Sequence, residues 1–375
     1  MFLPSEPSSD VLDPSPALLP MVAADPGVVD GAGTAITAVV HTAVDHTLSP
    51  AARAAVEAGV PASTRRAYAA DWQGFTAWCA TAGRVALPAT AQTVTEYAAH
   101  LTRTSSAKTG RPLAPSSIER TLTAIRSMHK AADVVAPETS GARKVLAGRR
   151  EELALAHDSA ATVRKATPAL PAEIRQMLAG LDRASLAGMR DAALVLLGYA
   201  TAARSSELAA LNIGDVVETP EGLVVTVYRR KIKKHTETAV PYGSNPATCP
   251  VRATRALLAA LAERGRTSGP LLVRIDRHGR LAPPLTRGGR VIGDPEGRMT
   301  AEAVADVVTR LAQAADLSGD WSGHSLRRGF ATAARRQGHA LERIGRHGGW
   351  ADGSRALLGY LEDADQWTDN PVVGL

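Results

Sequence analysis

The chain has little cysteine, few aromatic residues and no long apolar run. Only two cysteines, Cys79 and Cys249, occur in 375 residues, and they stand far apart. This excludes a disulfide framework and a cysteine-based metal site. No apolar stretch reaches about 18 residues, so we expect no membrane-spanning helix. Nor does a basic segment precede an apolar one near the start, which argues against a secretory signal. We therefore expect a cytoplasmic protein.

The residues that are present suit a folded protein with a modest basic excess. Hydrophobic residues make up 45% of the sequence, enough to bury a sizeable core. The length favours two domains over one. Lysine and arginine total 43 against 37 acidic residues, a formal charge of +6. This excess is compatible with a nucleic-acid partner, but the charge alone does not show whether the protein binds nucleic acid.

Composition divides the chain into segments. Residues 1–50 are rich in Pro, Ser, Asp, Gly and Ala and predict a disordered tail, apart from a short apolar stretch at Thr34–Ala43. Residues 51–150 predict a helical domain, and 151–168 predict a linker. Residues 169–375 predict a second, larger domain.

Aromatic residues at helical spacing mark the first domain. Tyr68, Trp72, Phe75 and Trp78 recur at intervals of three and four, and Ser63 precedes them as a candidate N-cap. Such a stripe is typical of a packed core, so we interpret it as core and not as a ligand site.

Two more helices are expected in this domain. One covers Ala91–Arg103, and Ser116 is a candidate N-cap of the other. In the latter helix Arg126 and Lys130, four residues apart, lie away from the apolar face. They form either a solvated surface or a contact to DNA.

The second domain is predicted to be mainly helical with one small hairpin. Pro171 suits the first turn of a helix, and Asp191–Tyr199 is apolar almost all round, as in a buried helix. Apolar residues alternate through 223–228, which predicts a strand. Thr238–Pro241 is its candidate partner, and Arg229–Glu237 is the basic turn between them. The further helices are expected at Pro250–Arg264, Ala301–Ala314, Ser325–Gln337 and Ser354–Asp363.

Two short motifs place arginine beside a second polar residue. Arg204 follows the apolar helix, and Glu207 is three residues further on, within reach on one helical face. His324 and Arg327 are likewise one turn apart, and arginine binds phosphate through a planar fork. Each motif also has a bland interpretation: a structural ion pair for the first and a surface feature for the second.

Two other places carry reactive side chains. The basic turn holds Lys231 and Lys233, which could enter a DNA groove and donate a proton, although such turns are usually just solvated. Gly348-Gly349-Trp350 is followed by Tyr360 on a helix close to the C-terminus. Tyrosine in such a helix is more often a packing residue than a nucleophile.

Taken in order, these residues resemble the catalytic set of the tyrosine recombinase (phage integrase) family. The set reads Arg204, Glu207, Lys231, His324, Arg327, Trp350 and Tyr360. The resemblance extends from about Ser63 to the C-terminus, and the His-x-Leu-Arg-x-Gly match is among its most specific parts.

The resemblance implies a fold and a chemistry. The fold would be mainly α with a small antiparallel β-hairpin sheet, and a helical core-binding domain and a catalytic domain would form a C-shaped clamp on DNA. Tyr360 would attack the scissile phosphate to give a 3′-phosphotyrosyl bond, with neither metal nor other cofactor. Arg204 and Arg327 would hold the phosphate oxygens, Lys231 would protonate the leaving oxygen, and His324 would assist proton transfer or orient the phosphate.

The remaining residues and partners follow from the same resemblance. Trp350 would donate a hydrogen bond through its ring, and Glu207 would orient its neighbours. The DNA-binding candidates are Arg126, Lys130, Lys233 and Arg328. The expected partners are double-stranded DNA and three further copies in a homotetramer, and the family also admits accessory DNA-bending proteins. An acidic segment after Tyr360, through Pro371, would either dock on a neighbouring protomer or be a frayed tail.

Three features depart from the family pattern. Ala202 stands where glycine is common, two residues before Arg204. Trp350 and Tyr360 are ten positions apart, one more than expected, which leaves His347 as an alternative to Trp350. The lysine could be Lys231 or Lys233.

Three other classes remain open. A DNA-binding protein of the same fold could lack cleavage activity, and a topoisomerase-like tyrosine enzyme would cut without choosing a site. A helical scaffold with a basic surface would depend on none of these residues for chemistry. The presence of every catalytic residue type favours the recombinase.

Overall fold

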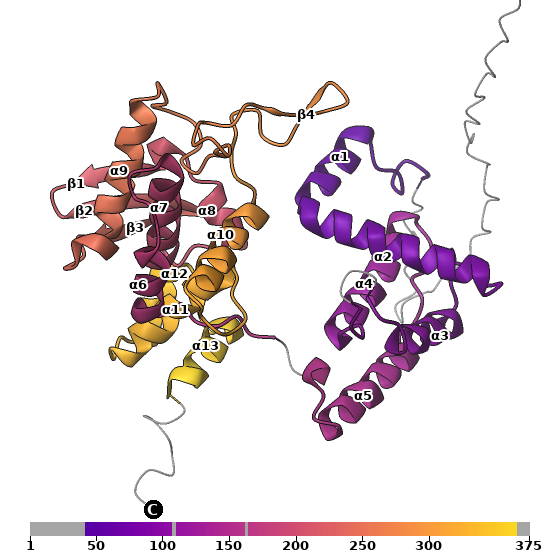
Figure 1. Cartoon of the computed structure of the whole chain (residues 1–375). Coiled ribbons are helices and arrows are strands. Elements are labelled where there is room, and N and C mark those ends of the chain that lie inside the picture. Colours follow the sequence, from indigo (N-terminus) through magenta and orange to yellow (C-terminus); the bar gives the residue numbers. More distant parts are fainter. Residues whose placement is uncertain (1–41, 107–109, 162–163, 366–375) are drawn as a thin grey trace, which may run out of the picture. The chain divides into compact units, whose positions relative to one another are not determined.

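The computed structural model describes residues 42–106, 110–161 and 164–365. The chain forms two compact units, one up to Thr162 and the other from Val163 (Figure 1). Each unit has its own hydrophobic core. The division falls inside the 151–168 segment, although a helix continues to Leu155 and buries Leu153.

The described part of the first unit is helical. Its elements are α1 (Pro50–Gly59), α2 (Ala62–Thr81), α3 (Ala91–Thr102), α4 (Pro115–Ala131), α5 (Ser140–Leu155) and the 3₁₀ helix η1 (Ser159–Ala161). Phe75 is fully buried at the centre of the core, with its ring centroid 5.6 Å from that of Trp72 and 5.1 Å from that of Tyr97. The interpretation of the aromatic stripe as core is thus confirmed for Trp72, Phe75 and Trp78, whereas Tyr68 is half-buried and lies outside the core cluster.

Two predicted helix caps are wrong. Helix α2 begins at Ala62 with Pro61 as its N-cap, so Ser63 lies inside the first turn. Helix α4 begins at Pro115, which places Ser116 inside that helix as well. The physical reason is that proline has a fixed φ and lacks an N–H that would be unpaired there, so it starts a helix ahead of the serine.

The second unit combines helices with two small antiparallel sheets, which confirms the predicted fold class. Its helices are α6 (Pro171–Ala179), α7 (Leu186–Ala200), α8 (Ser205–Ala209), α9 (Pro250–Ala262), α10 (Ala301–Ala314), α11 (Gly323–Arg336), α12 (Leu341–Gly348) and α13 (Arg355–Asp365), with 3₁₀ turns η2 (Ile213–Asp215) and η3 (Pro246–Thr248). Its strands are β1 (Val216–Thr219), β2 (Gly222–Arg229), β3 (Lys234–Pro241), β4 (Leu285–Arg287) and β5 (Arg290–Ile292).

The predicted hairpin is present but its turn is shorter than expected. Strand β2 extends to Arg229 and pairs with β3, so that Tyr228 faces His235 and Arg229 faces Lys234. The turn therefore comprises residues 230–233. Strand β1, on the other edge of β2, and the β4–β5 hairpin were not predicted. These strands have three or four residues, too few to show a period of two.

Helix α7 is the central element of this unit. Its residues from Ala192 to Leu197 are all buried, as their apolar run predicts, and α7 packs against both α9 and α11. Although α7 is so apolar, no helix in the described ranges is long and apolar enough to cross a membrane.

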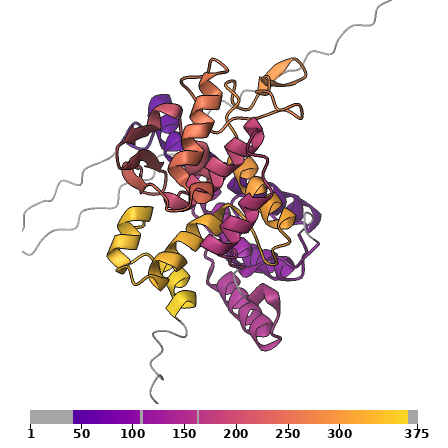
Figure 2. The same ribbon diagram turned by 60° about the vertical axis from the view of Figure 1, so that its left-hand side comes forward.

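A separate small core joins the C-terminal helices. Helix α11 packs against α12 and α13, and Figure 2 shows the yellow C-terminal helices grouped at one end of the unit. Trp350, Ile344 and Leu357 are buried there, with Tyr360 packed against them. This small core brings the last two predicted site residues together.

Candidate active site

Arg204 and Glu207 form the pair that their spacing predicts. Arg204 is the N-cap of the short helix α8, and its backbone N–H donates to Glu207 Oε2 at 3.0 Å. Its Nη1 donates to Glu207 Oε1 at 2.6 Å. The Glu207 carboxylate is fully buried, while the Arg204 side chain is 24% exposed. Glu207 therefore fixes Arg204 from the buried side, and Arg204 can still contact a ligand on its exposed side.

The buried carboxylate of Glu207 stays ionised. Burial by itself raises the pKa of Glu207, but the backbone N–H of Arg204 and the charges of Arg204 and Arg229 outweigh it. The net result is a pKa below the usual value. Glu207 is therefore a fixed negative charge among arginines, which suits the orienting role expected for it.

Arg229 is a site residue that the sequence did not reveal. The sequence places Arg229 in a basic turn of the kind that is usually solvated, but its side chain is 0% exposed. Its Nη1 donates to Glu207 Oε2 at 3.2 Å, so two arginines share this carboxylate. The alternation along β2 was the signal that Arg229 would be buried, because Arg229 faces the same side of the strand as the buried Leu223, Val225 and Val227.

Helix α11 carries His324 and Arg327. Ser322 caps the helix by accepting a hydrogen bond from the His324 N–H at 3.2 Å. One turn later, the helix passes so close to the chain before α6 that a Cβ on Gly329 would lie 2.0 Å from the Ala169 carbonyl oxygen. Glycine at position 329 thus permits the close contact with Ala169 that fixes α11.

The imidazole of His324 is poised as a neutral base. Partial burial, followed by the charges of Arg327 and Arg204, lowers the pKa of His324 from its ordinary 6.5. At neutral pH the ring is therefore uncharged and able to accept a proton.

Arg327 is almost entirely buried and only partly paired. Its Nη1 donates to the carbonyl oxygens of Ala202 and Gly348, the second at 2.7 Å. Its Nη2 is buried and has no hydrogen-bond partner within the described ranges. Burial, then the charge of Arg204, lowers the pKa of Arg327 to about 9, which leaves the guanidinium protonated at neutral pH. An unpaired cationic donor of this kind is costly unless a ligand pairs with it.

Trp350, and not His347, is the ring beside Arg327. The Arg327 guanidinium carbon lies 3.6 Å from the centre of the Trp350 ring, whose centroid is 6.3 Å from that of Tyr360. His347 instead places Nε2 2.7 Å from the Ala200 carbonyl oxygen and stacks on Phe330. The ten-residue spacing therefore still brings the tryptophan and the tyrosine together.

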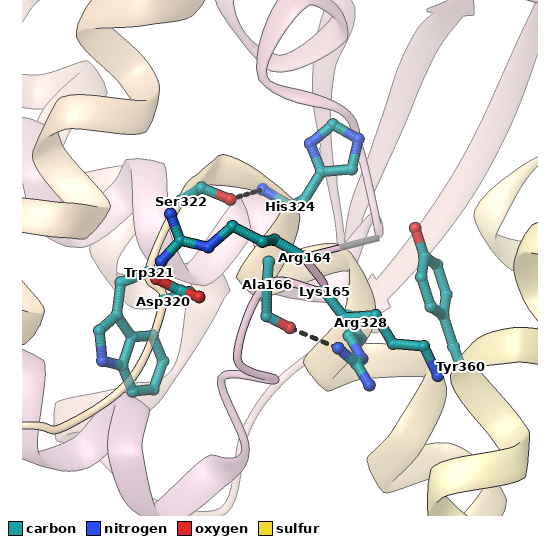
Figure 3. Close-up of a pocket in the computed structure, with 9 residues that line it drawn as sticks. All are labelled: Arg164, Lys165, Ala166, Asp320, Trp321, Ser322, His324, Arg328 and Tyr360. Carbon is teal, nitrogen blue, oxygen red and sulfur yellow. Dashed lines mark hydrogen bonds and ion pairs between the residues drawn. The ribbon is translucent and has the colours of Figure 1, made fainter. Parts of the chain in front are cut away.

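Tyr360 and His324 line one cavity of about 510 Å³ (Figure 3). The same cavity is lined by Arg164 and Lys165, which precede α6 and belong to the predicted linker. Figure 3 shows their side chains running apart, toward Asp320 and toward Tyr360. Arg164 forms an ion pair with Asp320 at 2.8 Å. The basic Arg-Lys dipeptide was the signal for this second pair of missed residues.

The other predicted residues lie apart from this cluster. Lys231 and Lys233 are exposed in the β2–β3 turn, with no hydrogen bond or ion pair to the cluster among the described residues. Arg126 and Lys130 lie on an exposed face of α4, in the first unit. Arg328 is buried and donates to the Ala166 carbonyl oxygen at 2.7 Å. The binding of Arg126, Lys130, Lys233 and Arg328 to DNA stays a prediction. The acidic segment after Tyr360 continues helix α13 as far as Asp365, and its remainder, residues 366–371, lies outside the described ranges.

Known proteins with similar sequences act on DNA. The chain is 30% identical over 292 residues to an integrase/recombinase xerD homolog of Selenomonas ruminantium, covering 76% of this chain and 78% of that protein. It is 24% identical over 314 residues to the recombinase cre of Escherichia phage P1, covering 79% and 82%. Fold, site and relatives together define the class as site-specific DNA recombinases that cleave and rejoin DNA with a tyrosine.

The family follows from a longer match. The family model described as the phage integrase family matches residues 170–366, more than half of the chain. The chain therefore belongs to the phage integrase family. A crystal structure of a lambda integrase dimer bound to a core site has the same fold, with a TM-score of 0.51, 12% identity and coverage of 85% of this chain and 94% of that one.

Proposed function

We propose that Tyr360 is the nucleophile with which this recombinase cuts DNA. Its phenolic oxygen bonds to the scissile phosphorus while the bond from phosphorus to the 5′-oxygen breaks. The phenol proton passes to the neutral imidazole of His324, and a lysine gives a proton to the leaving 5′-oxygen. Attack by a 5′-hydroxyl on the phosphotyrosyl bond reverses these transfers and rejoins the strand.

One observation carries this proposal: the buried Arg327 keeps an Nη2 group without a hydrogen-bond partner among the described residues. Its guanidinium stacks on Trp350, whose ring contacts Tyr360, and Arg327 lies one helical turn after His324. A non-bridging phosphate oxygen is a fitting partner for the Nη2 group, because negative charge builds on it in the transition state. Arg204 would hold the other oxygen, with Glu207 keeping it in place. Trp350 would support Arg327 by stacking.

The remaining roles are assigned by resemblance and position. Lys231 is the preferred general acid, with Lys233 as the alternative on the same turn. Arg126, Lys130 and Arg328 would contribute to DNA binding, and the two units would close as a clamp around the duplex. We also propose that the protein acts in the cytoplasm without a cofactor, as a homotetramer that holds two DNA sites.

Covalent trapping tests the nucleophile. The purified chain is incubated with duplexes that span the DNA flanking its gene and carry a nick near each candidate cut. After digestion, mass spectrometry identifies any peptide that bears a nucleotide. We expect the Tyr360 peptide to carry it and Tyr360→Phe to lose it while keeping its DNA affinity.

Other outcomes point to the other classes. An adduct on a different tyrosine would contradict the assignment of Tyr360. DNA binding without any adduct at any tested duplex would favour a binder of the same fold. Cleavage of unrelated sequences together with relaxation of supercoiled plasmid would favour a topoisomerase-like enzyme.

A further inference from the structure

Arg229 is a fully buried charge at the end of strand β2, immediately before the turn that carries Lys231. Its guanidinium reaches four acceptors. Nε donates to Thr236 Oγ1 at 2.9 Å, and Nη1 donates to Glu207 Oε2 at 3.2 Å. Nη2 donates to the carbonyl oxygens of Thr201 at 3.0 Å and His347 at 3.3 Å.

These acceptors belong to four different elements. Thr236 lies on β3, Glu207 on α8, Thr201 at the end of α7 and His347 on α12. One planar group therefore fixes the hairpin against the segments around the arginine–glutamate pair and against the helix that leads to Trp350.

Gly349 packs directly against the Arg229 side chain. Gly349 has a left-handed backbone with φ of 64°, and a Cβ there would lie 2.7 Å from Arg229 Nε. The backbone after α12 thus lies directly on the arginine side chain. Because there is no space for even a methyl group, this contact leaves Arg229 little freedom to move.

Stability alone does not explain a charge in this place. Removing a guanidinium from water is expensive, and an apolar side chain of similar volume often stabilises a core as well or better. Burial indeed lowers the pKa of Arg229, opposed by the charge of Glu207. An arginine is favoured when its fork of five donors must hold several groups in one geometry.

We propose that Arg229 is a positioning residue for DNA cleavage. It holds the β2–β3 turn, and hence the proton-donating lysine, in register with the Arg204–Glu207 pair. This inference rests on the proposed function, because it assumes cleavage with a lysine as general acid. It holds for either lysine, since Lys231 and Lys233 share the turn.

A sulfur substitution in the DNA separates positioning from folding. The duplex recovered by covalent trapping is made in two forms, with oxygen or with sulfur as the 5′-bridging atom. A thiolate leaves without a proton, because a thiol has a pKa of about 8.5, far below that of an alcohol. Cleavage of the sulfur duplex therefore does not depend on where the lysine lies.

The variants are Arg229→Lys, which keeps the charge but loses the fork, and Thr236→Val, which removes only the acceptor of Nε. We expect Arg229→Lys to cleave the oxygen duplex about 100-fold more slowly than wild type, the usual contribution of a general acid. On the sulfur duplex its defect should shrink to less than about tenfold. Thr236→Val should show the same pattern with a smaller loss.

Arg190→Lys is the matched control. Arg190 is also largely buried and donates to a backbone carbonyl, that of Val273, and to Asp191, but none of its partners belongs to the site. It should affect both duplexes equally or neither.

Two results would decide against the inference. Equal losses on the oxygen and sulfur duplexes for Arg229→Lys and Thr236→Val would leave Arg229 with a structural role only. If covalent trapping recovers no duplex that the wild-type protein cleaves, the proposed function itself is refuted. If Arg229→Lys is unfolded by circular dichroism, Thr236→Val gives the same comparison.

Discussion

The guanidinium carbon of Arg327 lies 3.6 Å from the centre of the Trp350 ring, closer than any other cation lies to an aromatic ring in the described part of the chain. The edge-on contact of the same ring with Tyr360 makes Trp350 the spacer between the arginine and the proposed nucleophile. A desolvated cation–π contact of this kind contributes about 2 kcal/mol.

Replacing Trp350 tests this contact. Because the ring is buried in the small C-terminal core, Trp350→Ala should lower the free energy of unfolding by about 3–5 kcal/mol and abolish the Tyr360 adduct. Trp350→Phe keeps a ring face for Arg327 and should retain adduct formation. Urea unfolding and adduct yield measure both effects, and an unchanged unfolding midpoint in Trp350→Ala would contradict the packing described above.

Two substitutions on the β2–β3 turn show which lysine is the general acid. Lys231 and Lys233 are both exposed, so replacing either with alanine should leave the fold intact. We expect Lys231→Ala to slow strand cleavage by about 10²–10⁴-fold, and Lys233→Ala by less than about tenfold. Quench-flow or gel assays of single-turnover cleavage give both rates. The opposite ranking would transfer the general acid to Lys233.

Histidine burial predicts an acid-sensitive fold. Burial, together with the charge of Arg229, lowers the pKa of His347 from 6.5, despite the opposing hydrogen bond to Ala200. The unfolded chain therefore binds this proton more tightly than the folded one, so stability rises with pH and is lost as the pH falls below 6.5. His347→Gln keeps a donor for the Ala200 carbonyl without titrating.

The melting temperature of His347→Gln should accordingly fall less than that of wild type between about pH 7 and pH 5. Differential scanning calorimetry at several pH values measures the difference. Parallel curves for the two proteins would show that His347 does not contribute to the acid sensitivity.

Close packing at Gly329 predicts a strongly destabilising methyl group. Since a Cβ there would meet the Ala169 carbonyl oxygen at 2.0 Å, the backbone must shift. Gly329→Ala should therefore lower the free energy of unfolding by about 3 kcal/mol. Gly148 on α5, which has nothing within 4 Å of its Cβ position, is the control. There the same substitution should stabilise the helix by about 0.5–1 kcal/mol, and equal effects at both positions would refute the close approach.

Local sequence patterns were sufficient for most of the secondary structure. Helix α10 has the bounds predicted from its period, and Pro171 begins α6 as expected. Helices α1, α5 and α12 were not predicted as separate elements. Strands β4 and β5 span three residues each, too few to show a period, and proline moved the caps of α2 and α4.

The sequence also contained the pairs whose members are neighbours along the chain. Arg204 and Glu207 are three residues apart, so helix geometry alone brings them into contact. His324 and Arg327 likewise share helix α11, one turn apart. The order of the motifs was enough to suggest the family.

Only the tertiary structure decided what surrounds these pairs. The acceptors of Arg229 are up to 118 residues away, and those of Arg327 up to 125. The alternation along β2 places Arg229 on the inward face, but nothing local shows whether a charged group there would find partners. The outcome depends on whether distant segments present a carboxylate and free carbonyl oxygens at one point, because a buried guanidinium is stable only where such acceptors meet it.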